Sequence, residues 1–361
     1  MHKELGSEFW TGCTPASSVE YGLRPQNIYN TYLYTETLSG RTALEYIVEI
    51  LCGKGQKMAY LPSYCCHTMI EPFLRHGMKV RFYDVQLTNQ GLHRALDNSA
   101  EYDAILLMDY FGHTDAETLG MAVKEKVKGK TVIYDATHSM YSLIDTSPCD
   151  FIYGSYRKWV DINCGFVAWN KEQYKGEVTK NYDYVNYADA RARLFDLKAD
   201  FIKGGKTQKS EFLPLIDTAE TILEGEYHHR LPDDRSKEVL RTTDVEYIIA
   251  KRRYNARVLI EAINDLNDGR VRCVNPLLNT FDTPLFVPVM VAPEHRNQLR
   301  RYLIEHEIYC PVHWPLTEDH EPMAGASQMF ASELSLICDQ RYDEDDMLRI
   351  AATIADYLKK N

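Results

Sequence analysis

The sequence predicts an α/β protein with a mostly parallel sheet covered by helices on both faces, followed by a smaller α+β unit. Short apolar runs rich in β-branched and aromatic residues alternate with segments of helical periodicity along the first half of the chain. Such alternation is typical of parallel strands joined by crossover helices, which bury both faces of the sheet. A second, shorter alternation follows the Asn-Asp-Gly break at residues 267–269.

The changes in pattern divide the 361 residues into three segments. Residues 1–38 are irregular and rich in Tyr, Thr and Ser, so we expect an N-terminal arm there. Residues 39–269 carry the first alternation and are expected to form a large domain. Residues 270–361 carry the second alternation and are expected to form a small C-terminal domain.

Individual elements follow from the spacing of apolar residues. Apolar side chains at 44, 47, 48 and 51 have helical spacing, and Ser39 or Gly40 is a suitable cap for that helix. Shorter apolar runs predict strands. In order, we expect further strands at 57–62, 79–85, 102–111, 131–137, 151–154, 165–169, 285–291 and 308–312, and further helices at 64–76, 115–128, 210–224, 244–266, 294–306 and 344–358.

Charge and cysteine content disfavour several classes of protein. The net charge is −11, with 41 Lys and Arg against 52 Asp and Glu, so a nucleic-acid surface is not expected. No run of about 18 apolar residues is present, so we expect no membrane span. The nine cysteines lack metal-ligand and Cys-x-x-Cys spacing. We therefore expect reduced thiols, no bound metal and, without a secretory signal, a cytoplasmic protein.

Two charged residues stand at the ends of predicted neighbouring strands. Asp135 ends the run from residue 131, and Lys158 lies just past the run 151–154. If these strands are parallel neighbours, both groups lie at one sheet edge. Pyridoxal 5′-phosphate requires such a pair, because a lysine forms a Schiff base with its aldehyde and an acid keeps its ring nitrogen protonated. Taken singly, Asp135 could instead cap the next turn and Lys158 could be a solvated surface residue.

Three other features extend the cofactor hypothesis. His138 is placed to reach the phenolic oxygen of the cofactor, with a half-buried packing histidine as the alternative. The helix start at Ser39 and Gly40 offers backbone N–H groups to a phosphate, with a capped surface helix as the alternative. Ser155 adds a hydroxyl for the same anion. His313 and Trp314 either contact a substrate or form a buried structural pair.

Several segments in register resemble fold-type I pyridoxal-phosphate enzymes, in particular the DegT/StrS-like sugar aminotransferases. They are SGRTAL, LPSYCCHTMIEPFLRHGMKVRFYDV, DAILLMDYFGHTD, VIYDATHS and GSYRKWVDINCGFVAWN, with fainter likeness in PLFVPVMV, IYCPVHWPL and LSLICDQRYDEDDMLRI. The resemblance implies a mostly parallel seven-stranded sheet in a three-layer αβα large domain. It also implies a homodimer, which the N-terminal arm is a candidate to bridge.

The resemblance also assigns roles to individual residues. It implies that Lys158 is the Schiff-base lysine, that Asp135 holds the ring nitrogen, and that His138 lies near the phenolic oxygen. The phosphate would receive backbone amides and a hydroxyl from Gly40, Arg41, Thr42 and Ser155. The position where these enzymes usually carry a ring-stacking aromatic holds Cys66 here, so either Tyr64 or His67 stacks instead, or the stacking is weak.

Two departures bear on the substrate. The run that follows the lysine, residues 159–165, is shorter than in sugar aminotransferases. Their Gly-x-Asn-x-Arg-Met segment is also not recognisable, and the nearest text is Tyr184 to Arg193. We expect an aminotransferase that uses a donor such as glutamate and a keto-sugar nucleotide or related small carbonyl acceptor. The alternatives are a lyase or dehydratase with the same cofactor, or a cofactor-binding protein without turnover.

Overall fold

An eight-stranded sheet forms the centre of the computed structural model, which describes residues 4–17, 32–89, 91–171, 174 and 186–361. The strand order is β2-β9-β8-β7-β6-β3-β4-β5, in which the block from β8 to β4 is parallel and the outer strands pair antiparallel. The strands are β2 (Tyr32–Thr37), β3 (Met58–Pro62), β4 (Lys79–Thr88), β5 (Gly91–Ala95), β6 (Ala104–Met108), β7 (Thr131–Asp135), β8 (Phe151–Ser155) and β9 (Gly165–Asn170).

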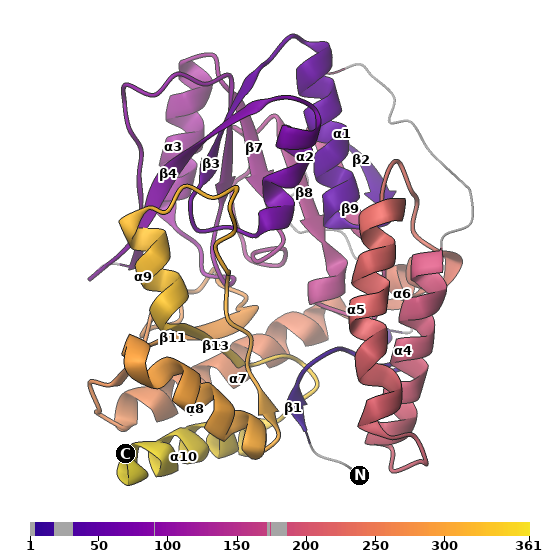
Figure 1. Cartoon of the computed structure of the whole chain (residues 1–361), viewed down its shortest axis with the longest axis vertical. Helices are drawn as coiled ribbons and strands as arrows, with labels where there is room; N and C mark the ends of the chain where they lie inside the picture. The colour runs from indigo at the N-terminus through magenta and orange to yellow at the C-terminus, as the bar shows by residue number, and fades with distance from the viewer. Residues whose placement is uncertain (1–3, 18–31, 90, 172–173, 175–185) are drawn as a thin grey trace.

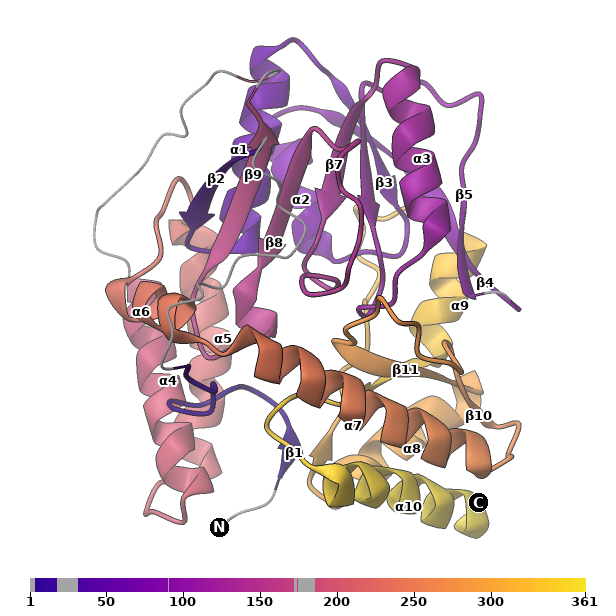
Figure 2. The same ribbon diagram turned by 180° about the vertical axis from the view of Figure 1, so that it is seen from behind.

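Helices cover both faces of this sheet. Helices α1 (Gly40–Gly53) and α2 (Glu71–Arg75) lie on the face toward the viewer in Figure 1. Helix α3 (Ala116–Val127) lies on the opposite face, which Figure 2 turns to the front. The parallel strands between them are almost wholly buried, as two covered faces require. The predicted three-layer α/β class is therefore confirmed.

The sheet has eight strands, so the count of seven that the resemblance implied is wrong. The apolar runs predicted six of the eight, and the two that they did not predict, β2 and β5, lie at the sheet edges. Their sequences, YLYTET and GLHRA, are mixed and only partly buried. An edge strand has a neighbour on one side only, so it carries a weaker apolar signal than a central strand.

The predicted helix over 64–76 is also wrong in extent. Cys66 is extended, a single 3₁₀ turn covers His67–Met69, and α2 begins only at Glu71. Pro72 occupies the first turn of α2, where its missing N–H costs nothing. Within a longer helix the same proline would remove a hydrogen bond and clash with the preceding turn, which accounts for the break.

A second buried core lies beside the large sheet. It is built on the antiparallel sheet β10-β11-β13 and on helices that pack against it. The elements after β9 are α4 (Asn186–Ile202), α5 (Lys209–Glu226), α6 (Asp234–Thr242), α7 (Val245–Asp265), β10 (Val271–Cys273), β11 (Phe286–Val291), α8 (Pro293–Glu305), β12 (Ile308–Tyr309), α9 (Ala324–Ser332), β13 (Glu333–Ile337) and α10 (Glu344–Lys360).

Helix α7 contributes to both cores. Ile248, near its start, belongs to the core of the large sheet, whereas Leu259 and Ile263 pack in the second core. Figure 2 shows α7 running across the base of the molecule beside α10. The domain boundary at residue 270 stays a prediction, with α7 as the element that joins the two cores.

The described part of the predicted N-terminal arm packs against this same chain. Strand β1 (Leu5–Gly6) pairs with β12, and Leu5 is fully buried in the second core. Ala16 forms a β-bridge with Thr243. Residues 18–31 of the arm lie outside the described residues.

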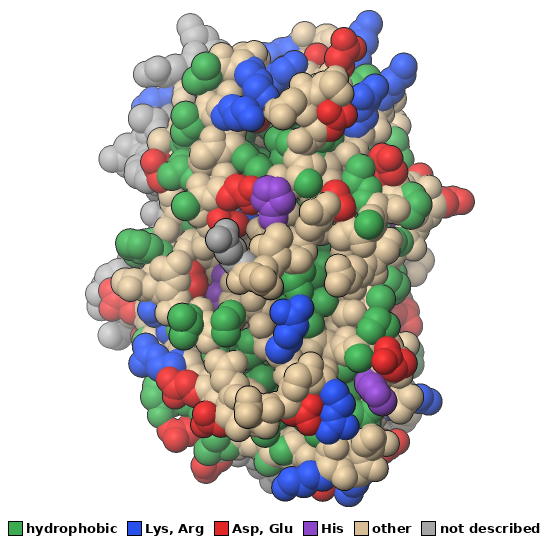
Figure 3. All heavy atoms as spheres, turned by 90° about the vertical axis from the view of Figure 1, so that its left-hand side faces the viewer, with side chains coloured by type: hydrophobic (Ala, Val, Ile, Leu, Met, Phe, Trp, Pro, Cys, Tyr) green, Lys and Arg blue, Asp and Glu red, His purple; other side chains and the backbone are tan. Residues whose placement is uncertain are grey.

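The surface shows mixed charge on the face drawn in Figure 3, where Lys and Arg side chains are interspersed with Asp and Glu. Among the described residues, no helix combines the length and the apolar character needed to cross a membrane.

Candidate active site

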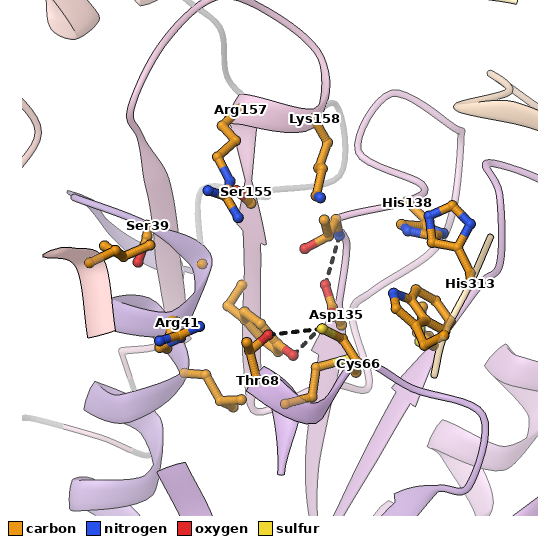
Figure 4. Close-up of a pocket in the computed structure, with 18 of the residues that line it drawn as sticks. Ser39, Arg41, Cys66, Thr68, Asp135, His138, Ser155, Arg157, Lys158 and His313 are labelled. Atoms are coloured by element: carbon orange, nitrogen blue, oxygen red, sulfur yellow. Dashed lines mark hydrogen bonds between the residues drawn. The ribbon is translucent and has the colours of Figure 1, made fainter. Parts of the chain in front are cut away.

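Most of the predicted site residues line one cavity of about 200 Å³. The cavity lies where the carboxyl ends of β7 and β8 meet the start of α1 and the segment that carries His313 and Trp314. In Figure 4, the Lys158 amine points into the cavity, with Asp135 beneath it, Arg41 to one side and His313 to the other. Groups far apart in the sequence thus meet at one place.

The parallel pairing of β7 and β8 brings the two charged groups together. Asp135 is the last residue of β7 and pairs with Tyr153 of β8. Three residues past the end of β8, Lys158 lies in a 3₁₀ turn. Asp135 and Lys158 therefore both line the cavity, as their positions at neighbouring strand ends predicted.

Asp135 is a buried carboxyl held by two hydrogen bonds. The backbone N–H of Thr137 donates to Oδ1 at 2.8 Å, and the Tyr153 hydroxyl donates to Oδ2 at 2.9 Å. Burial raises the pKa of Asp135, against the lowering effect of these hydrogen bonds. A protonated nitrogen brought into the cavity would compensate the buried carboxylate and favour its ionised form.

Lys158 is open to the cavity, yet the surrounding protein changes the chemistry of its amine. Its side chain is solvent accessible through the cavity. The cavity walls still replace much of the water around Nζ, and this desolvation, helped by the positive charge of Arg157, lowers the pKa of Lys158. A lowered pKa increases the neutral fraction, which is the nucleophilic form toward an aldehyde.

His138 is neutral and its tautomer follows from its hydrogen bond. The backbone N–H of Phe111 donates to Nδ1 at 3.3 Å, so the ring proton lies on Nε2. Burial, with a smaller effect of Lys158, lowers the pKa of His138 to about 3. His138 also packs against Trp314, with ring centroids 5.1 Å apart. It therefore offers the cavity an N–H donor without a charge.

The start of α1 approaches the strand ends closely because two glycines permit it. A Cβ on Gly165 would lie 2.3 Å from the backbone carbonyl carbon of Ser39, and a Cβ on Gly40 would lie 3.1 Å from the Cβ of Ser155. Ser39 caps the helix by accepting the N–H of Thr42 at 3.1 Å. The positive end of the α1 dipole therefore faces the cavity beside Ser155.

Arg41 adds a buried cation at this end of the cavity. Its side chain is only 8% exposed, and the nearest carboxylate, Glu71, lies 3.8 Å away. The Nε and Nη1 atoms are buried without a hydrogen-bond partner. Buried donors without acceptors cost free energy, so an anion in the cavity would satisfy them. The sequence named Arg41 only for its backbone amide.

Thr42 does not line the cavity, contrary to the predicted phosphate contact. Its N–H is used by Ser39, and its hydroxyl donates to the carbonyl of Tyr227 at 2.7 Å. The capping bond turns this amide away from an incoming ligand. The N–H groups of Gly40 and Arg41 remain at the helix start.

Tyr64 and His67 are also not brought to the cavity. Tyr64 is fully buried and its hydroxyl donates to the carbonyl of His313 at 2.7 Å. The His67 ring lies beside Thr317 and 3.5 Å from Asp319. Cys66 lines the cavity instead, so neither predicted replacement for the stacking aromatic occupies that wall.

His313 lines the cavity and is held from behind by residues that the sequence did not indicate. Its Nδ1 lies 2.9 Å from Ser335 Oγ, and that hydroxyl donates to Glu333 Oε1 at 2.5 Å. The backbone N–H of His313 donates to the other oxygen of Glu333 at 2.9 Å. With Nδ1 engaged, Nε2 is the ring nitrogen available to the cavity. The sequence did carry a signal for this support, because Glu333 and Ser335 alternate with apolar residues along β13.

Glu333 predicts a pH dependence of stability. Burial raises the pKa of Glu333 from 4.5 to about 8. Between pH 4.5 and about 8, Glu333 keeps its proton in the folded chain and loses it in the unfolded chain. The contribution of this proton to the free energy of unfolding is therefore full below about pH 4.5 and is lost as pH rises to about 8. We expect wild type to lose about 1.4 kcal/mol per pH unit relative to Glu333→Gln across this window. Urea unfolding at pH 5, 6.5 and 8 measures it, and parallel curves would contradict the assignment.

The segment nearest in sequence to the missing sugar-aminotransferase motif, residues 184–193, contributes no described residue to the cavity. Residues 184 and 185 are outside the described residues, and the remainder begins α4. Within α4, Arg191 is buried and pairs with Glu8 of this chain at 2.8 Å. Two side chains that the sequence did not indicate, Arg157 and Glu220, line the cavity instead. They form an ion pair that links the turn after β8 to α5.

Comparison with known proteins finds similarity at the level of structure. No family model and no curated protein sequence matches the chain. Helicobacter pylori PseC, an aminotransferase involved in the biosynthesis of pseudoaminic acid, is similar with a TM-score of 0.70 at 13% identity, over 99% of this chain and 100% of that chain.

Two further solved structures are similar over most of the chain. DesI, solved in the presence of its TDP-sugar product, gives a TM-score of 0.62 at 15% identity, covering 89% of this chain and 79% of its own. NtdA from Bacillus subtilis, solved with the bound cofactor PMP, gives 0.62 at 13% identity, covering 90% and 73%. These likenesses show that the chain has the fold of the fold-type I aminotransferases, as the sequence resemblance predicted.

Proposed function

We propose that this protein is a pyridoxal-phosphate-dependent aminotransferase. It would use an amino acid such as glutamate as donor and a keto-sugar nucleotide or a related small carbonyl compound as acceptor. One observation carries the proposal: the cavity holds an accessible lysine amine, a buried carboxyl and, at a helix start, a buried arginine whose Nε and Nη1 lack hydrogen-bond partners. The sugar acceptor is supported by the structural likeness to PseC and DesI.

The cavity residues fit the three polar parts of the cofactor. Lys158 offers an amine of lowered pKa to an aldehyde. Asp135 offers a buried carboxylate to a ring nitrogen, and its cost of burial falls when that nitrogen is protonated. Arg41 and the start of α1 offer unpaired donors to a phosphate. Each group thus lacks the kind of partner that the cofactor would provide.

Bound pyridoxal phosphate would supply a carbon for covalent attachment and a ring that accepts electrons. The chain's own residues would then direct the reaction. The Lys158 amine would take a proton from the donor's α-carbon and return it at a neighbouring atom. Asp135 would hold a proton on the ring nitrogen, and the Nε2–H of His138 would donate a hydrogen bond within the cavity. His313 would contact the substrate through Nε2.

The test is a half-reaction with purified, cofactor-loaded protein. Glutamate should change the visible absorbance of the bound cofactor and yield one equivalent of 2-oxoglutarate per chain. Ammonia without 2-oxoglutarate would identify a lyase or dehydratase. Tight cofactor binding with no spectral change for any of the twenty amino acids would identify a protein without turnover. Either result contradicts transamination.

Arg41 predicts a phosphate-specific loss of affinity. Arg41→Met keeps much of the side-chain volume but removes the charged donors, and hydrogen bonds to charged groups are worth about 1.5–3 kcal/mol. We therefore expect PLP to bind roughly 10 to 100 times more weakly. Binding of pyridoxal, which has no phosphate, should be unchanged.

The matched control for Arg41 is Arg75→Met. Arg75 lies over the same Tyr227 ring at the same 5.3 Å distance and also pairs with Glu71, yet it does not line the cavity. Fluorescence titration with PLP and pyridoxal measures both variants. Equal losses for the two ligands, or for the two arginine variants, would contradict a phosphate contact.

We further propose a homodimer, on the basis of the sequence resemblance. Light scattering should give about twice the chain mass of 41.7 kDa. A monomer with full activity would contradict this proposal without affecting the assignment of the cavity.

A further inference from the structure

A cluster of two glutamates and three histidines lies outside the cavity, beside α1. Its members are Glu45, Glu49, His76, His228 and His229. Glu45 and Glu49 are four residues apart on α1 and therefore lie on one face of the helix. His76 follows the last residue of α2, and the other two histidines lie in the loop after α5. Three separate segments thus meet here.

The three residues nearest one another have the spacing of metal ligands. One ligand atom from each of Glu45, Glu49 and His76 lies within 4.8 Å of the others. The distance from His76 Nε2 to Glu45 Oε1 is 3.4 Å. Two zinc ligands at about 2.0–2.1 Å in a tetrahedral arrangement are separated by roughly 3.3 Å, so the His76 imidazole and the Glu45 carboxylate are already about that far apart.

Glu45 carries a free buried oxygen at this place. The residue is only 2% exposed, and its Oε2 has no hydrogen-bond partner although it is buried. Removing a carboxylate oxygen from water without a partner is costly. A cation bound at Oε2 would supply the missing interaction.

The remaining histidines hold the two carboxylates. Arg75 can only donate, and its Nη1 lies 2.7 Å from His228 Nε2, so the His228 proton lies on Nδ1. That Nδ1–H donates to Glu45 Oε1 at 2.6 Å. His229 Nε2 lies 3.0 Å from Glu49 Oε1. Hydrogen bonds to ligating carboxylates are the outer support that metal sites use.

We propose that Glu45, Glu49 and His76 bind one divalent transition-metal cation, with Zn²⁺ as the probe. Two carboxylates neutralise the charge of the cation. The positive charge of the nearby Arg75 is offset by its ion pair with Glu71. One imidazole nitrogen with carboxylate oxygens suits zinc better than magnesium, which prefers oxygen ligands. Three protein ligands leave a fourth position for water. The site is separate from the proposed aminotransferase chemistry.

The experiment titrates full-length, chelator-treated protein with Zn²⁺ by calorimetry, and with Mg²⁺ for comparison. We expect one Zn²⁺ per chain and binding of Mg²⁺ at least tenfold weaker. Glu45→Gln and His76→Asn should each lower Zn²⁺ affinity by more than about tenfold. The control His306→Asn changes an exposed histidine on α8's C-terminal side and should bind Zn²⁺ as wild type does.

Two results would overturn the proposal. One is Zn²⁺ affinity that is the same in wild type, Glu45→Gln and His76→Asn. The other is a zinc X-ray absorption spectrum with sulfur ligands, which would assign the ion to one of the nine cysteines. Glu49→Gln, on a less buried carboxylate, gives a second test if Glu45→Gln does not fold, as judged by circular dichroism.

Discussion

Lys158→Ala should abolish transamination while leaving a folded protein that still binds the cofactor noncovalently. The substitution removes the amine that we propose both attaches the cofactor and carries the proton, so we expect kcat to fall by about 10⁴-fold or more, at or beyond the upper range for a positioned proton donor. The side chain projects into the cavity and is solvent accessible there, so its truncation should cost little stability. Glutamate half-reaction rates measure the loss.

Two further measurements separate the amine's chemistry from its charge. Lys158→Arg keeps the positive charge but not the nucleophile and should be as inactive as Lys158→Ala. Added methylamine should partly restore the Lys158→Ala rate, because the emptied space lies open to the cavity. The control Lys203→Ala alters an exposed lysine at the end of α4 and should retain full activity. An active Lys158→Ala enzyme would refute the assigned role.

The sequence predicted the centre of this site because strand geometry constrains it strongly. Parallel neighbours β7 and β8 end at one sheet edge, so Asp135 and Lys158 could be brought together from their positions alone. The helix start at Gly40 was predicted for a similar reason, since the Ser-Gly pair marks a capped N terminus. These inferences depend on backbone direction rather than on side-chain packing.

The parts that the sequence missed depend on side-chain contacts between distant segments. Nothing in the local text shows that the guanidinium of Arg41 is buried without an acceptor. The support of His313 by Ser335 and Glu333 joins residues 20 or more positions apart. Tyr64 was expected at the cofactor, but its hydroxyl is used by the carbonyl of His313. Such pairings depend on the three-dimensional packing of segments that are distant in the sequence.

The second large effect is expected from Asp135→Asn. Asparagine keeps the shape and an oxygen that can accept the Thr137 N–H, but it cannot stabilise a protonated ring nitrogen. Removing one electrostatic contact of this kind from an enclosed site costs roughly 10² to 10³ in rate. We therefore expect kcat to fall by that factor while the cofactor stays bound through Lys158 and Arg41. Stopped-flow absorbance with glutamate measures the rate.

Tyr153→Phe separates the charge of Asp135 from the architecture around it. It deletes the hydroxyl that donates to Asp135 Oδ2 and leaves the carboxyl in place. That hydrogen bond stabilises the ionised form, so its loss should raise the pKa of Asp135 further and slow the reaction by only about tenfold. The ¹⁵N shift of a labelled ring nitrogen should report a protonated ring in wild type and an unprotonated one in Asp135→Asn. An unchanged shift in Asp135→Asn would show that the carboxyl supports the cavity wall without touching the ring, because a structural role alone does not move this proton.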